Sequence, residues 1–405
     1  MKNINSMKKF VFILIAFACI GWSAMAQTAY ITSLNPSELF VVNVQTNAVI
    51  TTIGVLNYPD AVATSLDGTR VYVANSQGNV NTINTATNAV IGSYVLVGNN
   101  PVALCVIPDG SKVYVVNDYD SSVSVINTAS NSVIATVRVG NHPWGIAASP
   151  DGSKVYVTNL YVNTVSVINT ATDAVSTTIP VGGYPQGVAF SPNGTKAYVT
   201  NGNDNTVSVI NAATNAVSAI ITGLNFPIGV CVSPDGSKVY VGNEGNGTVS
   251  VINAATNSVV TSITTGGSPD GIATSPDGTK VFVVNNTSNT VSIINTATNS
   301  VSTTLTGFHS PKSFGNFIST AITGIPSLNF QSEGIGIYPN PTTNTFTIHQ
   351  DKYSPNQQLA ITDVLGNRVY SQALNTATET IDVSHLSGGI YFYEVSGKRG
   401  KIIKQ

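Results

Sequence analysis

Residues 185–223 read PQGVAFSPNGTKAYVTNGNDNTVSVINAATNAVSAIITG, and this stretch decides the fold. It holds four short runs rich in β-branched and aromatic residues, at 187–190, 197–200, 206–210 and 216–221. Turn residues separate the runs, and no helical period occurs, so we expect four β-strands, termed a, b, c and d. The Pro-Asn-Gly sequence between the first two runs supplies the residues that a tight hairpin turn needs.

The stretch is one copy of a repeat with a constant period. Its first residue recurs every 42 positions without insertion or deletion, as Pro59, Pro101, Pro143, Pro185, Pro227, Pro269 and Pro311. Four strands in a unit of about 40 residues are typical of a β-propeller blade. The repeat therefore predicts an all-β fold built from such blades.

The two ends of the repeat region predict how the blades close into a ring. The first unit starts at strand b, residues 29–32, and has no strand a of its own. The last unit consists of a strand a alone, residues 314–319. We expect residues 314–319 to pair with 29–33, which gives seven closed blades over residues 27–319 and removes two free sheet edges.

Two tetrapeptides in the repeats carry a family resemblance. Tyr156-Val157-Thr158-Asn159 and Tyr198-Val199-Thr200-Asn201, with the Val-Ser-Val-Ile-Asn segments that follow, resemble the YVTN family of β-propeller repeats. The resemblance covers residues 29–319. It implies an extracytoplasmic surface protein and no single activity.

The N-terminal residues 1–26 have the pattern of a secretory signal peptide. Three lysines precede an apolar run over residues 10–22, and Ala24 and Ala26 form a small-x-small cleavage site before Gln27. The apolar run is shorter than a membrane-spanning helix requires. We therefore expect cleavage between Ala26 and Gln27, and no transmembrane span in the mature chain.

The 42-residue period stops after residue 319. Residues 320–334 are expected to form a linker, and 335–405 contain seven strand-like runs that predict a small β-sandwich. Four motifs there resemble the C-terminal sorting domain of type IX secretion cargo; they include Tyr338, Pro339, Asn340, Pro341, Gly366, Gly389, Tyr391, Lys401 and Lys404. The resemblance implies contact with the type IX machinery and passage through the periplasm and outer membrane of a Gram-negative bacterium, so that the protein is secreted or held at the cell surface.

Composition excludes some partners. Only 9% of the 405 residues are charged and the formal net charge is −2, so the chain lacks the basic field that nucleic-acid binding requires.

Cys105 and Cys231 occupy equivalent sites three units apart, too distant for a disulfide, and we expect two small buried thiols.

One face of the predicted ring varies between units, whereas the other repeats. The b–c loops and d–a crossings differ from blade to blade and bring aromatic and acidic side chains to one end of the central channel. A glycan or peptide ligand could stack on the aromatic rings and donate hydrogen bonds to the acids, although drift of ordinary loop residues explains the pattern equally well. The candidate binding residues are Tyr58, Asp60, Asp118, Asp120, His142, Trp144, Tyr161, Tyr184, Gln186, Asp204, Phe226, Glu244 and Asp270.

No catalytic motif is found in the chain. There is no nucleophile elbow, phosphate-binding loop or His-Glu-x-x-His, so we predict no catalytic residue, metal or cofactor. The expected function is that of a non-catalytic, monomeric binding or adhesion protein. Two alternatives stay open: a structural coat component, and a lactone hydrolase whose channel holds Ca²⁺ on Asp60, Glu244 and Asp270.

Overall fold

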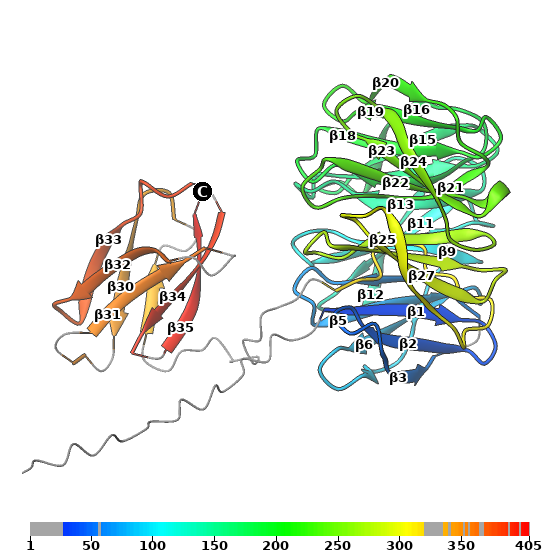
Figure 1. Cartoon of the computed structure of the whole chain (residues 1–405). Helices are drawn as coiled ribbons and strands as arrows, with labels where there is room; N and C mark the ends of the chain where they lie inside the picture. The colour runs from blue at the N-terminus through cyan, green and yellow to red at the C-terminus, as the bar shows by residue number, and fades with distance from the viewer. Residues whose placement is uncertain are drawn as a thin grey trace, which may run out of the picture. The chain divides into compact units, whose positions relative to one another are not determined.

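The computed structural model describes residues 27–55, 58–319, 335–338, 342–350, 353–354, 357–363, 368–387, 389–396 and 398–404. The chain divides into two compact units, Met1–Gly324 and Ile325–Gln405 (Figure 1). The predicted signal peptide and linker lie outside the described residues. Within the described part, no helix has the length and apolar character needed to cross a membrane.

The first unit is a ring of antiparallel sheets, here numbered as blades 1–7 in chain order. Blade 1 has β1 (Thr28–Ser33), β2 (Glu38–Asn43) and β3 (Val49–Gly54); blade 2 has β4 (Pro59–Thr64), β5 (Arg70–Asn75), β6 (Asn79–Asn84), β7 (Ala89–Val90) and β8 (Val95–Leu96). Blade 3 has β9 (Pro101–Val106), β10 (Lys112–Asn117), β11 (Ser122–Asn127) and β12 (Ser132–Arg138); blade 4 has β13 (Pro143–Ala148), β14 (Lys154–Asn159), β15 (Thr164–Asn169) and β16 (Ala174–Pro180). Blade 5 has β17 (Pro185–Phe190), β18 (Lys196–Asn201), β19 (Thr206–Asn211) and β20 (Ala216–Ile221). Blade 6 has β21 (Pro227–Val232), β22 (Lys238–Asn243), the 3₁₀ turn η1 (Glu244–Asn246), β23 (Thr248–Asn253) and β24 (Ser258–Thr264); blade 7 has β25 (Pro269–Thr274), β26 (Lys280–Asn285), β27 (Thr290–Asn295) and β28 (Ser300–Leu305).

The core lies between neighbouring blades. Strand b of each blade carries one fully buried aromatic side chain, namely Tyr30, Tyr72, Tyr114, Tyr156, Tyr198, Tyr240 and Phe282. Valines on either side of these aromatic residues are also buried, because each sheet is covered by a blade on both faces. This explains why strands b and c lack the polar alternation of a half-exposed strand.

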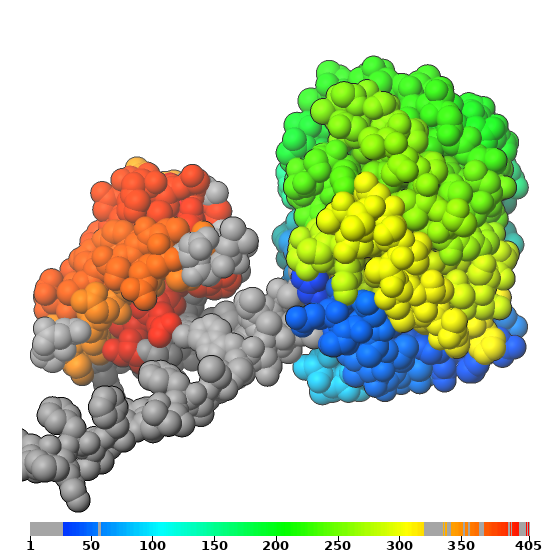
Figure 2. Space-filling model, in the orientation of Figure 1, coloured from blue at the N-terminus to red at the C-terminus, as the bar shows by residue number. Residues whose placement is uncertain are grey.

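The predicted closure of the ring is confirmed. Isolated bridges pair Ala29 with Ile318 and Thr32 with Lys312, and the amide of Tyr30 donates a hydrogen bond of 2.8 Å to the carbonyl of Phe317. The C-terminal segment 312–318 therefore supplies the inner strand of blade 1. Phe317 and Ile318 pack in one core with Ala29 and Tyr30. The surfaces of blade 7 (yellow) and blade 1 (blue) adjoin in Figure 2.

In several blades, a basic side chain at the start of strand b donates a hydrogen bond to the backbone of the next blade. Arg70 donates to the carbonyl of Thr128 at 2.8 Å, and Lys154 donates to the carbonyl of Ala212 at 2.7 Å. Lys280 spans the closure in the same way, because its Nζ lies 2.6 Å from the carbonyl of Val44. These bonds join the a–b turn of one blade to the c–d turn of its neighbour.

The second unit is the predicted β-sandwich. Its two antiparallel sheets have the orders β29–β30–β33 and β32–β31–β34–β35; the strands are β29 (Ile335–Tyr338), β30 (Thr345–Gln350), β31 (Gln357–Thr362), β32 (Arg368–Leu374), β33 (Thr378–Asp382), β34 (Gly389–Val395) and β35 (Lys398–Lys404). Apolar side chains from both sheets, such as Phe346 and Ile361, form one core.

The predicted sorting residues fall partly within this sandwich. Tyr391 is buried and its hydroxyl donates to the carbonyl of Ser387 at 2.9 Å. Gly389 begins β34, and the backbone of Lys401 and Lys404 lies in β35. The backbone of Tyr338 ends β29, whereas residues 339–341 and 366 lie outside the described residues.

Candidate functional site

The inner strands of the ring bring one residue from each blade to the end of the central channel where the b–c loops lie. These seven residues follow the repeated prolines, and we term them the mouth ring: Asp60, Val102, Trp144, Gln186, Ile228, Asp270 and Lys312. Glycines allow the inner strands to approach closely; a Cβ at Gly187 would lie only 2.3 Å from the carbonyl oxygen of Ile228. The residues that occupy equivalent positions on the inner strands are therefore neighbours in space.

The charged members of the mouth ring lie on successive inner strands. Lys312 Nζ lies 2.9 Å from Asp60 Oδ1, and the Asp60 side chain is 11% exposed. Asp270 is the next member on the other side of Lys312. Burial, followed by repulsion from Glu244, raises the pKa of Asp270 to about 7, while the Lys312 ammonium opposes the rise. One side of the ring thus combines a cation with a carboxylate that exchanges protons near neutral pH.

Two uncharged members of the ring keep unused hydrogen-bond donors. Trp144 Nε1 and Gln186 Nε2 are buried, and neither has a hydrogen-bond partner among the described residues. The Trp144 ring packs edge-on against Phe314, with 6.1 Å between the ring centroids. Since a buried donor without an acceptor costs free energy, these N–H groups favour a bound water or ligand oxygen.

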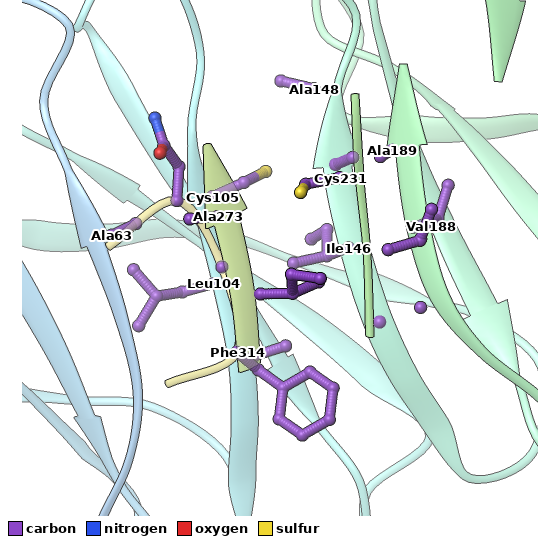
Figure 3. A pocket seen from close by; sticks show the side chains of 18 of the residues that line it. Ala63, Leu104, Cys105, Ile146, Ala148, Val188, Ala189, Cys231, Ala273 and Phe314 are labelled. Carbon is purple, nitrogen blue, oxygen red and sulfur yellow. The ribbon is translucent and has the colours of Figure 1, made fainter. Parts of the chain in front are cut away.

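A cavity of about 390 Å³ extends along the channel beneath the mouth ring. Figure 3 shows its lining of small and apolar side chains from the inner strands, among them Ala63, Leu104 and Phe314. Asp270 is the one mouth-ring residue that also lines it, and exposed lining residues at the other end, Leu66 and Pro150, belong to a–b turns. The cavity therefore reaches the surface on the repetitive face.

The two propeller thiols face this cavity. Cys105 and Cys231 are unpaired, and burial raises the pKa of both thiols above the ordinary range (Figure 3). A thiol that stays protonated behaves as a small apolar group. Both residues therefore act as lining of the channel.

Five rings from blades 3–6 form a continuous row on the variable face. We term Tyr119, His142, Tyr161, Tyr184 and Phe226 the aromatic arc. Successive ring centroids are 6.3, 4.4, 6.2 and 6.0 Å apart. The structure thus brings together four of the predicted aromatic residues. Tyr58 lies outside the arc, because the crossing that carries Asn100 comes between Tyr58 and His142 along the ring.

The predicted acidic residues of the b–c loops bond to the neighbouring d–a crossings. Asp118 Oδ1 lies 2.8 Å from His142 Nδ1, and Asp118 Oδ2 accepts a hydrogen bond from Asn100. Asp120 accepts the amide of Asn99 at 2.7 Å. In blade 5, the amide of Gly183 donates to Asp204 at 2.7 Å, and Ser268 donates to Glu244 at 3.1 Å in blade 6. These carboxylates orient the crossings; Asp118 is buried with both oxygens bonded, whereas the more exposed Asp120 and Asp204 keep lone pairs for a ligand.

Three residues that complete the site were missing from the sequence-based set. Lys312 supplies the cation of the mouth ring, Tyr119 extends the aromatic arc, and Phe314 packs against Trp144. Lys312 could have been found by its position after a repeated proline. Phe314 carries no such signal, since its role follows from the irregular course of the closing strand.

The acidic residues do not form the calcium site that one alternative required. Among the described residues, no group of three or more His, Cys, Asp or Glu side chains is arranged to hold a metal ion. Asp60 is instead paired with Lys312, whose ammonium group also lowers the negative potential at Asp270.

Comparison with known families identifies both units. Residues 29–313 match the family described as lactonase, seven-bladed β-propeller, and 336–405 match the secretion-system C-terminal sorting domain. Both resemblances drawn from the sequence motifs are thereby confirmed. The sorting domain also confirms export by type IX secretion to the cell surface or the extracellular space. An ulvan lyase from Nonlabens ulvanivorans is 34% identical over 73 residues, which is 18% of this chain and only 14% of the lyase.

Solved structures with a similar fold include three propellers. A protein of unknown function from Desulfotomaculum acetoxidans has a TM-score of 0.63 at 20% identity, over 73% of this chain and 98% of that one. Two proteins provisionally named 6-phosphogluconolactonases, from Bacteroides uniformis and Bacteroides fragilis, both have TM-scores of 0.62, at 17% and 18% identity. They cover 71% of this chain, and 98% and 97% of their own. At this identity the likeness shows the fold alone.

The family match contradicts the prediction that the chain is not an enzyme. A lactonase family model covers residues 29–313, which is nearly the whole propeller. The prediction failed because it relied on local motifs. Residues contributed singly by seven inner strands leave no such motif in the sequence.

Proposed function

The chain belongs to the family of seven-bladed lactonase β-propellers, and from this premise we propose that it is an exported hydrolase that opens lactones at its mouth ring. The observation that carries the proposal is the line of charged groups on successive inner strands. Lys312 pairs with Asp60, and Asp270 stands beside that pair with Glu244 within electrostatic reach.

Hydrolysis of a lactone requires a base and a group that stabilises negative charge. A water oxygen attacks the carbonyl carbon and gives up a proton, so that a tetrahedral oxyanion forms. The ring C–O bond then breaks, and the proton returns to the released oxygen to give a hydroxy acid. In this proposal the Asp270 carboxylate accepts and returns the proton, because a base that titrates near the working pH is effective.

The Lys312 ammonium is the candidate for stabilising the oxyanion. It is one-third exposed and keeps N–H donors beyond the one directed at Asp60. The unpartnered N–H groups of Trp144 and Gln186 belong to the same ring and are suited to hold a substrate oxygen after a small rearrangement. Asp60 then acts as the positioning residue that keeps Lys312 in place.

The charges near the mouth favour an uncharged lactone. Asp60, Glu244 and Asp270 supply three carboxyl groups against the single ammonium of Lys312. A lactone that carries a phosphate group would approach against this negative surplus. We therefore expect an unphosphorylated sugar lactone to react faster than its phosphorylated counterpart, unlike the substrate named for the two Bacteroides neighbours.

The test compares the hydrolysis of glucono-1,5-lactone and its 6-phosphate by the full chain. A pH-indicator assay between pH 6 and 8, corrected for spontaneous hydrolysis, should give a higher kcat/KM for the neutral lactone. Asp270→Asn should reduce kcat/KM by roughly 10²-fold or more, as expected for the loss of a general base. The activity of the wild type should rise with pH through about 7.

A matched control comes from the repeat itself. Asp151 lies in an a–b turn, and blade 5 has Asn193 at the equivalent position, so that turn accepts Asn. Asp151→Asn should retain full activity. The proposal is wrong if neither lactone is hydrolysed above the spontaneous rate, or if Asp270→Asn is as active as Asp151→Asn.

A further inference from the structure

We propose that the aromatic arc is a binding platform for a neutral oligosaccharide, separate from the mouth ring. The arc consists of Tyr119, His142, Tyr161, Tyr184 and Phe226. The proposal rests on the backbone conformation of the arc residues, on their exposure and contacts, and on the charges around them. It concerns binding and does not depend on lactone hydrolysis.

Three arc residues have a backbone conformation that disfavours them. His142, Tyr184 and Phe226 each precede the repeated proline, with φ of 49°, 60° and 45°. This left-handed region suits Gly or Asn, and bulky side chains there are strained. Asn100 occupies the same position in blade 3 with φ 52°, which demonstrates what the scaffold accepts. All seven residues before the repeated prolines have a positive φ, so the fold imposes this conformation, and large rings cost stability wherever they occupy these positions.

The rings of the arc are accessible yet ordered. Tyr119 is 70% exposed and Tyr161 is 59% exposed, whereas monomeric proteins usually cover large aromatic side chains in a continuous row. Tyr161 fills the space between His142 and Tyr184, at 4.4 and 6.2 Å between ring centroids. The row thus offers several π faces at fixed positions without first having to be ordered by a ligand.

The surroundings of the arc favour a saccharide over an anionic polymer. Asp118 lies 2.8 Å from the His142 ring of the arc, and the carboxylates of Asp120 and Asp204 lie in b–c loops of the same face, so the local charge is negative. The C–H face of a sugar ring carries partial positive charge and stacks on an aromatic face. Sugar hydroxyls can donate to the remaining lone pairs of Asp120 and Asp204. A proline-rich peptide could also stack on aromatic residues but would leave these acceptors unused.

The experiment measures binding by the full chain in the Asp270→Asn background, so that failure of the hydrolase proposal cannot affect it. Isothermal titration uses cellohexaose, mannohexaose and xylohexaose as saccharide probes and decaproline as the peptide probe. We expect saturable binding of at least one hexasaccharide. Tyr161→Ala combined with Tyr184→Asn should raise its Kd by at least about tenfold.

Tyr58→Asn is the matched control. Tyr58 has φ 59°, nearly identical to that of Tyr184, precedes a repeated proline on the same face, and lies outside the arc. Both Asn substitutions relieve the same backbone strain, so Tm should stay unchanged or rise by up to about 2 °C in each. Only the arc variant should lose saccharide binding. The proposal is overturned if no hexasaccharide binds, if decaproline binds instead, or if the arc variant binds as tightly as Tyr58→Asn.

Discussion

The ammonium group of Lys312 lies 2.9 Å from Oδ1 of Asp60, although the two residues are 252 positions apart in the chain. Lys312 belongs to the strand that closes blade 1, and Asp60 belongs to β4 of blade 2. The ion pair therefore links the closing strand of blade 1 to β4 of blade 2. It also places a positive charge beside Asp270 in the mouth ring. Variants of this pair should change both stability and the titration of Asp270.

Lys312→Met should destabilise the propeller by about 1–3 kcal/mol, because it leaves the buried Asp60 carboxylate without its partner. Lys312 also lowers the pKa of Asp270, so its loss should shift the pH–activity curve to higher pH. Glu244→Gln removes a negative neighbour of Asp270 and should shift the curve to lower pH. Measured kcat/KM between pH 5 and 9 checks both directions, and shifts of the same sign would contradict the arrangement.

Phe317→Ala should be among the most destabilising substitutions in the ring. Phe317 is fully buried in the core that joins blades 7 and 1, and its carbonyl accepts the amide of Tyr30. Truncation of a buried Phe typically costs about 3–5 kcal/mol. Urea unfolding measures the loss. Phe190→Ala is the control within strand a, since Phe190 is only partly buried and lies away from the closure; equal losses would argue against a special role for the closing strand.

The sequence predicted the scaffold well, because every blade repeats the same turns. The proline spacing predicted seven blades, and the missing strand a of residues 29–54 predicted closure by the last strand. The repeat also predicted that residues after each proline meet at one end of the channel. The number of blades, the closure and the position of these residues all follow from the strand order, and a 42-residue period without insertions is enough to predict that order.

The chemistry of the site could not be predicted in the same way. The pairing of Lys312 with Asp60 depends on contact between the two ends of the ring, and no spacing rule connects them. The opening of the cavity at Leu66 and Pro150 depends on side-chain packing along the channel. The raised pKa of Asp270 depends on burial and on Glu244 from another strand. The proposed catalytic role of Asp270 therefore rests on features that no spacing rule shows, although Asp270 itself was among the candidate residues.

Asp270 should make stability depend on pH in the opposite sense to most carboxylates. Its folded-state pKa is about 7, against about 3.9 in an unfolded chain, so the folded state binds more protons between these values. The contribution to stability is present below pH 4 and is lost as pH rises through 7. Asp270→Asn should thus be more stable than the wild type at pH 8, by roughly 2–4 kcal/mol at most, and equal to it near pH 4. Urea unfolding at both pH values tests this, and a constant difference would show that Asp270 is not the titrating group.

Removal of residues 398–405 should block export and leave the propeller in the periplasm. Residues Lys398–Lys404 form β35, which pairs with β34 from Val395–Lys398 to Gly389–Lys404, and Ile402 is buried in the core of the sandwich. The truncated sorting domain loses both an edge strand and part of its core, so the machinery that reads the folded domain should not accept it. Ile402→Asp tests whether loss of the core alone blocks export, because it keeps the basic residues and the length of the strand. Immunoblots of periplasm, membrane and medium measure the outcome: retention of both variants indicates that the fold is recognised, and normal export of the truncated chain would contradict the role of this strand.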